Sequence, residues 1–327
     1  MAHSVAVLIV NYNAQAYLPR CLEALAQQTY TPKRVIVMDN GSADDSIAAA
    51  KVSHPQFEYV ELGSNTGFAA ANNHGVELAN DVEWVALLNP DAFVAPEWLE
   101  ELVKASTENP QHQFFSSELM CDSPRDLIDG TGDCYHQSGL VWRRQHGLSK
   151  NHDQIGVSKH PMFSPCAAAA LYKRDVFLEV GGFDEDYFCY IEDVDLVFRM
   201  RLSGYSGQHV AKSVAYHVGS AITVRDSDFS IYHGHRNLVW TYVKNMPSGL
   251  LLKTLPQHLL LNLLSLIYYT LKGRPKVIFK AKWHALKGLN KQLKKRKGIQ
   301  ASNKISVMQL ESTMARGWLT PYLRRQA

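Results

Sequence analysis

The chain has 327 residues, of which 46% are hydrophobic and 20% are charged, and its formal net charge is +3. This composition supports a buried core and excludes a disordered chain or a small disulfide-stabilised protein. The five cysteines are an odd number without a CxxC pair, so we expect neither a disulfide framework nor a cysteine zinc site. The apolar run from Val5 to Val10 ends at an asparagine, so we expect no signal peptide or membrane span there and a chain that starts in the cytoplasm.

The near-neutral total hides an uneven distribution of charge. Residues 272–298 carry eleven positive charges and no acidic residue, so the rest of the chain carries −8 against the total of +3. A basic block beside a mildly acidic body predicts an anionic partner for that block, either lipid head groups or nucleic acid.

Short β-rich runs alternate with helical patterns in the first part of the chain. The apolar stripe of Leu18, Cys21, Leu22 and Leu25 predicts one helix, and Ser42 to Asp45 has the form of a capping box that opens another, ending near Lys51. The expected strands are 5–10, 34–39, 57–62 and 84–88, and a further helix is expected over 69–79. This alternation predicts an α/β fold with a parallel sheet.

Polar residues follow each of these strands. Ligands bind at the carboxyl ends of strands in open α/β sheets, and the clusters at 11–13, 39–40, 65 and 91 fall at those ends. The dinucleotide fingerprint G-x-G-x-x-G and the phosphate loop G-x-x-x-x-G-K-[ST] are both missing from the sequence. A bound diphosphate would therefore need a metal ion or basic side chains, and Asp91 is placed to hold a metal.

Six segments in order resemble the family 2 glycosyltransferases of the GT-A fold, and in particular their rhamnosyltransferase-like branch. The segments are VLIVNYN, VIVMDNGSADDS, NTGFAAANNHG, WVALLNPDAFV, GGFDEDYFCYIEDVDLVFRMRLSGY and YHVGSA. The resemblance covers roughly residues 4–245. It implies a Rossmann-like mixed sheet flanked by helices, with a GT-A domain over 1–229 and a C-terminal helical, membrane-associating region over 230–327.

The resemblance also implies a donor site for a nucleoside-diphosphate sugar. Tyr12 would pack on the nucleobase, Asp39 would accept its imide N–H, and Gly67 would allow close approach of the backbone. The implied donor-binding residues are Val10, Tyr12, Asp39, Asn65, Gly67, Asn72 and Asn89. A glycine-centred turn and an asparagine cap would explain 65–72 equally well.

A metal site follows from the same resemblance. Asp91 stands at the last position of the family's D-x-D motif, where a carboxylate and diphosphate oxygens would bind Mg²⁺ or Mn²⁺. Asn89 replaces the first acidic residue of that motif. His217 would be a second ligand, and the alternative is an ordinary solvated or core histidine.

The strongest chemical prediction lies in Tyr190 to Asp195. Inverting transfer needs a base that takes the proton of the acceptor hydroxyl, and the resemblance gives this role to Asp193, with Glu192 orienting the acceptor. The apolar periodicity that follows places Asp193 at a helix N-terminus, where the helix dipole favours an ionised carboxylate. The alternative is that Asp193 only caps the helix and that the nearby acids form a solvated face.

Two segments receive no single role from the sequence. The stretch Asp129 to Asp133 and the triplet Trp142 to Arg144 suit an acceptor-facing loop or an ordinary connecting region. Arg236 would either reach the donor diphosphate or only pack against neighbouring residues.

Two C-terminal helices are expected next to a membrane. A leucine-rich helix from Pro256 to Leu271 spans roughly 24 Å, too short for a bilayer core, and carries a polar stripe at 258, 262, 265 and 269. The next helix groups Lys276, Lys280, Lys287, Lys291 and Lys294 about 115° away from Phe279, Trp283, Leu286 and Leu293. This pattern predicts peripheral binding to an anionic membrane, and the alternative is an ordinary docking helix with a solvated charge stripe.

Together these features predict an inverting, metal-dependent glycosyltransferase on the inner face of a bacterial cell membrane. By resemblance the donor is dTDP-L-rhamnose and the acceptor is a lipid-linked glycan of a surface polysaccharide. One alternative is a protein that binds nucleotide sugars without catalysis. A nucleic-acid-binding protein is disfavoured, because Trp283 is nearly the only aromatic residue among the lysines.

Overall fold

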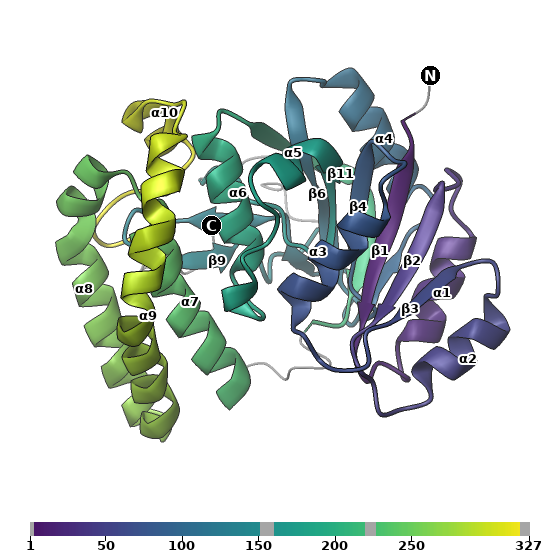
Figure 1. Ribbon diagram of the computed structural model, residues 1–327, viewed down its shortest axis with the longest axis horizontal. Helices are drawn as coiled ribbons and strands as arrows, with labels where there is room; N and C mark the ends of the chain where they lie inside the picture. The colour runs from purple at the N-terminus through teal and green to yellow at the C-terminus, as the bar shows by residue number, and fades with distance from the viewer. Residues whose placement is uncertain (1–2, 151–159, 220–226, 321–327) are drawn as a thin grey trace.

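The computed structural model describes residues 3–150, 160–219 and 227–320 (Figure 1). A mixed sheet of nine strands has the order β3-β2-β1-β4-β10-β6-β11-β5, with β7 paired to β6, and β8 and β9 form a separate hairpin. The strands are β1 (Val5–Asn11), β2 (Arg34–Asp39), β3 (Glu58–Glu61), β4 (Trp84–Leu88), β5 (Ala92–Val94), β6 (His112–Cys121), β7 (Ile128–Gly130), β8 (Asp133–Tyr135), β9 (Val141–Arg143), β10 (Ala169–Lys173) and β11 (Ser206–His217).

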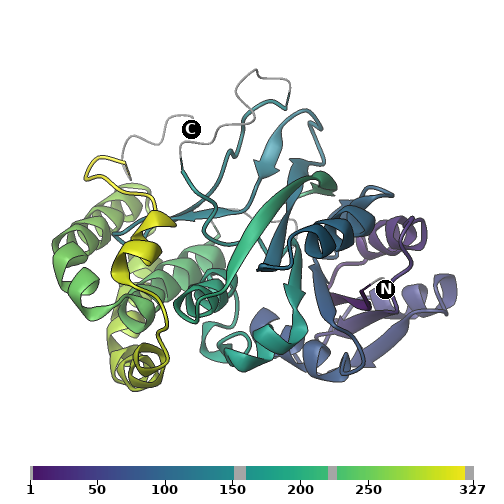
Figure 2. The same cartoon turned by 90° about the horizontal axis from the view of Figure 1, so that it is seen from above.

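Helices cover both faces of the sheet, and a further group of helices packs at one end of the molecule (Figures 1 and 2). The helices are α1 (Leu18–Ala26), α2 (Ser46–Ser53), α3 (Phe68–Leu78), α4 (Trp98–Glu108), α5 (Arg174–Glu179), α6 (Glu192–Leu202), α7 (Asp228–Asn245), α8 (Ser248–Leu271), α9 (Pro275–Ala301) and α10 (Val307–Ser312), with a short 3₁₀ helix at Glu185–Tyr187. One core cluster joins α1 and α4 to the sheet, and a second joins α3, α5 and α6 to its other face.

The expected α/β architecture is confirmed in its first half. Strands β1, β2, β3 and β4 pair in parallel, and β1 is buried along its whole length. The four apolar residues that predicted the first helix are the buried residues of α1. The sheet becomes mixed where β10 runs antiparallel to both β4 and β6. Continuous apolar runs therefore marked the buried parallel strands correctly.

The predicted capping box at Ser42 is wrong. Helix α2 begins at Ser46, with Asp45 as its N-cap and no side-chain capping bond. The Ser42 hydroxyl instead accepts hydrogen bonds from the Asn11 side chain and the Asn13 amide. Ser42 therefore stabilises the polar turn after β1. A capping pattern read from neighbouring residues cannot reveal this contact with a distant segment.

Helices α7 to α10 pack together at the end of the molecule opposite β1–β3 (Figure 2). One hydrophobic cluster contains Phe198 of α6 together with Tyr242, Leu250 and Leu310 from the C-terminal helices. The two parts of the chain therefore share a core. The domain boundary at 229 stays a prediction.

Four charged side chains also fasten these two parts to each other. The buried Lys244 amine on α7 lies 2.8 Å from an Asp195 oxygen on α6 and 2.5 Å from Asp184. Lys295 on α9 pairs with the same Asp184 and with Asp186. We name Asp184, Asp195, Lys244 and Lys295 the ionic clasp, because they join the helix that begins at Glu192 to the C-terminal helices.

Helix α8 differs from its predicted extent. It begins at Ser248 and has 24 residues, because Pro256 is accommodated inside it. Among the described residues, α8 is the one helix that is long and apolar enough to cross a membrane by length and composition. The predicted helix length is therefore too short, and the observed length gives no reason to exclude a membrane-spanning helix.

The packing of α8 supplies a different reason for it to lie along the protein. His258 stacks on Tyr242 with ring centroids 3.8 Å apart, Asn262 accepts from Lys282 at 2.6 Å, and Tyr269 contacts the ring of His235. The predicted polar stripe thus faces the protein. The exposed apolar residues of this helix are Leu252, Leu259, Leu260, Leu263, Leu264, Ile267, Tyr268 and Leu271.

Candidate active site

A cavity of about 1690 Å³ opens at the carboxyl ends of β1 and β4. Its lining includes most of the predicted site residues, namely Val10, Tyr12, Asn65, Gly67, Asn89, Asp91, Glu192, Asp193 and His217. They come from β1, the loop before α3, the turn after β4, the start of α6 and the end of β11. Residues more than 200 positions apart in the chain therefore face one space, which is large enough for a nucleotide sugar together with part of an acceptor.

Two predicted donor-site residues lie outside this lining. The Asp39 carboxylate accepts from the Asn11 side chain at 3.1 Å and from the Ser42 amide at 3.3 Å. The Asn72 side chain is buried and donates to the Phe68 carbonyl, one turn earlier in α3. The neighbouring Asn40 does line the cavity. The donor-binding roles of Asp39 and Asn72 stay predictions, and the geometry gives each a structural contact.

Gly67 is required by a close protein neighbour. Its φ is +89°, and a Cβ placed there would lie 2.6 Å from the Phe188 ring and 2.7 Å from the Phe188 carbonyl oxygen. A residue with a side chain would therefore clash as well as adopt an unfavourable backbone conformation. The close neighbour of Gly67 is thus the segment that precedes Asp193, and the expected approach to the donor stays a prediction.

Asp91 and His217 meet at the end of the sheet. Strands β5 and β11 pair with Ala92 opposite His217, so the two ligand candidates become neighbours. The His217 Nε2 lies 3.4 Å from an Asp91 oxygen, and the ring is 3% exposed. Among the described residues this Nε2 has no hydrogen-bond partner. A buried imidazole nitrogen facing a carboxylate fits a divalent cation.

Asp129 fixes the orientation of this histidine. Its carboxylate lies 2.8 Å from the His217 Nδ1 and also accepts from Arg143. An Nδ1–H bound to a carboxylate leaves Nε2 free to bind a metal ion. Burial would raise the pKa of Asp129, but hydrogen bonds from His146 and His217 and the charge of Arg143 hold it well below its usual range. The sequence singled out the 129–133 segment without a role, because nothing local connects it to residue 217.

Asp193 occupies the first turn of α6, as predicted, and its carboxylate accepts from the backbone amides of Ala167 at 3.2 Å and Val194 at 2.8 Å. The helix terminus is only one of the influences on the ionisation of Asp193. Burial raises the pKa of Asp193, and the two amides oppose that rise. A carboxylate with a raised pKa that still accepts amide hydrogen bonds is suited to take up a proton.

The nearby acids do not form the solvated face that was the alternative. Glu192 is 5% exposed, and its Oε2 has no hydrogen-bond partner among the described residues. Burial and then the charge of Asp193 raise the pKa of Glu192 well above its usual value. Asp195 is fully buried in the ionic clasp. The three acids therefore have different environments and different protonation behaviour.

The backbone before α6 is unusual. Phe188, Tyr190 and Ile191 all have positive φ, between 65° and 70°. Bulky residues adopt this conformation only when the surrounding structure holds them, and such residues cluster at functional sites. Arg236 donates to the carbonyls of Asp186 and Tyr187 just before this segment and lies outside the cavity lining. Of its two alternatives, the geometry supports packing.

The fold and this cavity define the class of protein. The sheet and its flanking helices match solved GT-A structures, among them the mannosyltransferase PcManGT of Pyrobaculum calidifontis, crystallised with GDP-Man and Mn²⁺, with a TM-score of 0.55 and 18% identity over 92% of this chain and 85% of that one. GalNAc-T7, crystallised with UDP, GalNAc and Mn²⁺, matches with a TM-score of 0.57 and 15% identity over 74% of this chain. This chain spans about half of that protein, 48%.

Sequence comparison identifies the family. Residues 6–181, more than half of the chain, match the profile described as "Glycosyl transferase family 2". The protein belongs to this family and is a glycosyltransferase. It is similar to the N-acetylglucosaminyl-diphospho-decaprenol L-rhamnosyltransferase of Mycobacterium tuberculosis, with 27% identity over 74% of this chain and 84% of that one. The rhamnosyltransferase WbbL of Escherichia coli is 26% identical over 65% of this chain and 83% of that one. The resemblance to the rhamnosyltransferase-like branch is confirmed.

Proposed function

We propose that the protein is an inverting glycosyltransferase that moves a sugar from a nucleoside diphosphate to an acceptor hydroxyl. The observation that carries this proposal is one cavity that holds both halves of the chemistry. Its lining contains Tyr12 and the Asp91–His217 pair, which would take the donor, and Asp193, which would take the acceptor. A reacting sugar between them would have its leaving diphosphate near one group and the attacking hydroxyl near the other.

On the donor side, Tyr12 would pack against the nucleobase, and Asp91 and His217 would hold Mg²⁺ or Mn²⁺. The metal ion would supply positive charge to the diphosphate as it leaves. The neighbours PcManGT and GalNAc-T7 were crystallised with Mn²⁺, which supports a divalent cation at this position. Asn89 lines the cavity in place of a second acidic ligand, so we expect the cation to bind tightly only when the diphosphate completes its coordination.

On the acceptor side, the Asp193 carboxylate takes the proton of the acceptor hydroxyl. The hydroxyl oxygen forms a bond to the anomeric carbon while the bond from that carbon to the diphosphate oxygen breaks, and the nucleoside diphosphate leaves with the electron pair. Attack from the face opposite the leaving group inverts the anomeric centre. Glu192 is buried beside Asp193 and, in its acid form, would donate to an acceptor oxygen.

The relatives support a particular donor and acceptor. Two of them are named as rhamnosyltransferases, and the mycobacterial one acts on a diphospho-decaprenol substrate by its name. We therefore propose dTDP-L-rhamnose as donor and a lipid-linked glycan as acceptor. Trp318 and Leu319 line the cavity and are 57% and 64% exposed, so a lipid-linked substrate would meet apolar side chains there.

The test is transfer from a panel of nucleotide sugars, with and without Mn²⁺, by the wild type and Asp193→Asn. We expect one donor to turn over, and Asp193→Asn to lower kcat by about 10²- to 10⁴-fold. Binding of the nucleoside diphosphate should persist in the variant. A variant that transfers at the wild-type rate would remove Asp193 from the chemistry and favour another base. A wild type that binds a nucleotide sugar without transferring it to any acceptor would favour the non-catalytic alternative.

We also propose that α8 and α9 hold the enzyme on the surface of an anionic membrane on the cytoplasmic side. The apolar face predicted for α9 is exposed, with Phe279, Trp283 and Leu286 each 57% accessible. The leucine face of α8 is also exposed. Apolar side chains can enter the head-group boundary while nearby lysines contact anionic lipid.

One of the predicted lipid-facing lysines has a different contact. The Lys291 amine lies 2.5 Å from an Asp186 oxygen, so it pairs with the catalytic part of the molecule. The other four are exposed, and two of them, Lys280 and Lys287, lie over the rings of Tyr232 and Trp283. Lys276 and Lys294 are therefore the better candidates for contact with lipid head groups.

A further inference from the structure

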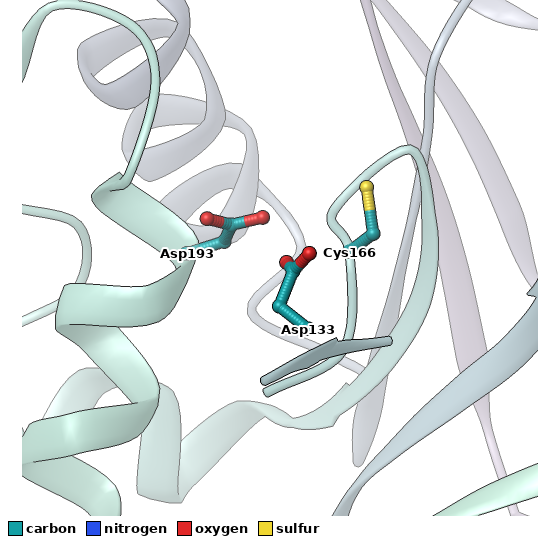
Figure 3. Close-up of side chains that lie close together, drawn as sticks. All are labelled: Asp133, Cys166 and Asp193. Atoms are coloured by element: carbon teal, nitrogen blue, oxygen red, sulfur yellow. The ribbon is translucent and has the colours of Figure 1, made fainter. Parts of the chain in front are cut away.

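A second aspartate faces the proposed base. Asp133 belongs to β8, is buried, and lines the same cavity as Asp193. Carboxyl oxygens of both residues and the Cys166 sulfur lie within 4.8 Å of one another. Figure 3 shows the Asp133 carboxyl directed into the space between Asp193 and Cys166. The transfer step described above does not use Asp133.

The two carboxyls have unequal surroundings. Asp193 accepts from two backbone amides, which stabilise its anion. Within the described residues, no hydrogen bond reaches the Asp133 carboxyl. The nearest cation, Arg143, donates to Asp129 and is paired there. Asp133 is therefore the member of the pair that has no hydrogen bond to its carboxyl and only the shared charge of Arg143 to support an anion.

The charged and titratable groups that face Asp133 come from several elements. They are Asp193 and Glu192 on α6, Arg143 on β9, Asp129 on β7, Tyr172 on β10 and the Cys134 and Cys166 thiols. Burial and then the charge of Asp193 raise the pKa of Asp133 to about 8. Burial also raises the pKa of the Cys166 thiol. At neutral pH Asp133 and the Cys166 thiol thus keep their protons, which suits a proton donor beside a base better than a metal cage.

We propose that Asp133 is an acid-form carboxyl that donates a hydrogen bond to the acceptor and positions its attacking hydroxyl beside the Asp193 carboxylate. The inference rests on the proposed function. A hydroxyl that accepts one hydrogen bond and donates another, each about 2.7 Å long, can bridge two oxygens up to roughly 5 Å apart. The separation within the Asp133–Asp193 pair falls inside that range. When Asp133 loses its proton, it loses the donor and places a second anion beside the base.

The first experiment measures the protonation of Asp133 directly and needs no turnover. Carboxyl ¹³C signals of labelled aspartates are followed from about pH 5 to about pH 9.5, and the signal missing in Asp133→Asn identifies the residue. We expect a midpoint near pH 8. A midpoint below about pH 5, close to that of an ordinary aspartate, would overturn the proposal.

The second experiment measures kcat/KM against pH for three variants. The wild type should lose activity above about pH 8, while Asp133→Asn, which keeps an N–H donor and cannot ionise, should not. Asp133→Ala should raise the acceptor KM by about three- to tenfold and leave the donor KM unchanged. Asp126→Asn, at an exposed position, is the matched control and should show the wild-type profile.

The outcomes separate the two proposals. If the wild type transfers sugar and Asp133→Asn keeps the wild-type fall above pH 8, the positioning role is wrong and the proposed function stands. If no donor is transferred although the ¹³C midpoint lies near pH 8, the proposed function is wrong and the positioning role is lost with it. A raised donor KM in Asp133→Ala would also contradict a role toward the acceptor.

Discussion

Helices α1 and α8 distribute their side chains in opposite ways. The residues Leu18, Leu22 and Leu25 of α1 pack against the sheet, and its polar residues face outward. In α8 the polar residues His258 and Asn262 contact the protein, and the leucines are exposed. An amphipathic pattern thus specifies two faces of a helix, and the surroundings decide which face points inward. The contrast is between a helix whose apolar residues are buried against the sheet and a helix whose apolar residues are exposed.

Among the changes that separate the catalytic part of the molecule from the C-terminal helices, the largest effect should come from one that touches the catalytic part alone. Asp129→Asn removes the charge that holds the His217 ring, so Mn²⁺ affinity in the presence of the nucleoside diphosphate should fall by about 10- to 100-fold. Isothermal titration calorimetry measures this, with Asp126→Asn as the control. Binding to vesicles should not change. Unaltered Mn²⁺ affinity would show that Asp129 does not orient a metal ligand.

A change on α8 should affect binding to vesicles and leave Mn²⁺ affinity unchanged. Glutamate at both Leu259 and Leu263, which are 60% and 54% exposed, removes apolar area from the outward face. Partitioning onto vesicles that contain phosphatidylglycerol should fall by at least about tenfold. Val52→Glu on α2, at a residue 83% exposed, is the matched control. If both variants sediment with vesicles as the wild type does, the exposed leucines are not a membrane face.

The smallest effect should come from the lysines of α9. Lys276→Gln or Lys294→Gln alone should weaken binding to anionic vesicles by about fivefold, because each lysine contributes about 1 kcal/mol near such a surface. Added salt should reduce the difference between variant and wild type. Lys104→Gln, on an exposed part of α4, controls for net charge. An equal loss on vesicles of neutral lipid would show that lysine charge is not the cause.

Much of the catalytic part was predictable from the sequence. Buried parallel strands give continuous apolar runs, and their carboxyl ends collect the polar residues that bind ligands. Asp91 was found in this way, and Asp193 was found by resemblance and by the apolar periodicity that follows it; the structure places both in one cavity. His217 was added by resemblance, in a segment that looks like the end of a strand. These signals are local, and the structure preserves them.

The remaining site residues depend on contacts between distant segments. Asp129 and Asp133 lie on strands of three residues, too short for a periodic pattern, and the pairing of β7 with β6 positions the first of them. The start of α8 was missed because Pro256 is tolerated inside it. The outward direction of its leucines follows from contacts with α7 and α9, which the sequence of α8 alone does not contain.

The ionic clasp limits how the C-terminal helices can be exchanged among related enzymes. Lys295 shares Asp184 with the buried Lys244, which in turn pairs with Asp195 two residues after the proposed base. A helical cassette grafted from a relative would have to supply a lysine at the same place, or leave a buried acid short of a counter-charge. The C-terminal helices and the helix that carries the proposed base are therefore joined in one folded unit in this chain, although the sequence presents them as two consecutive regions.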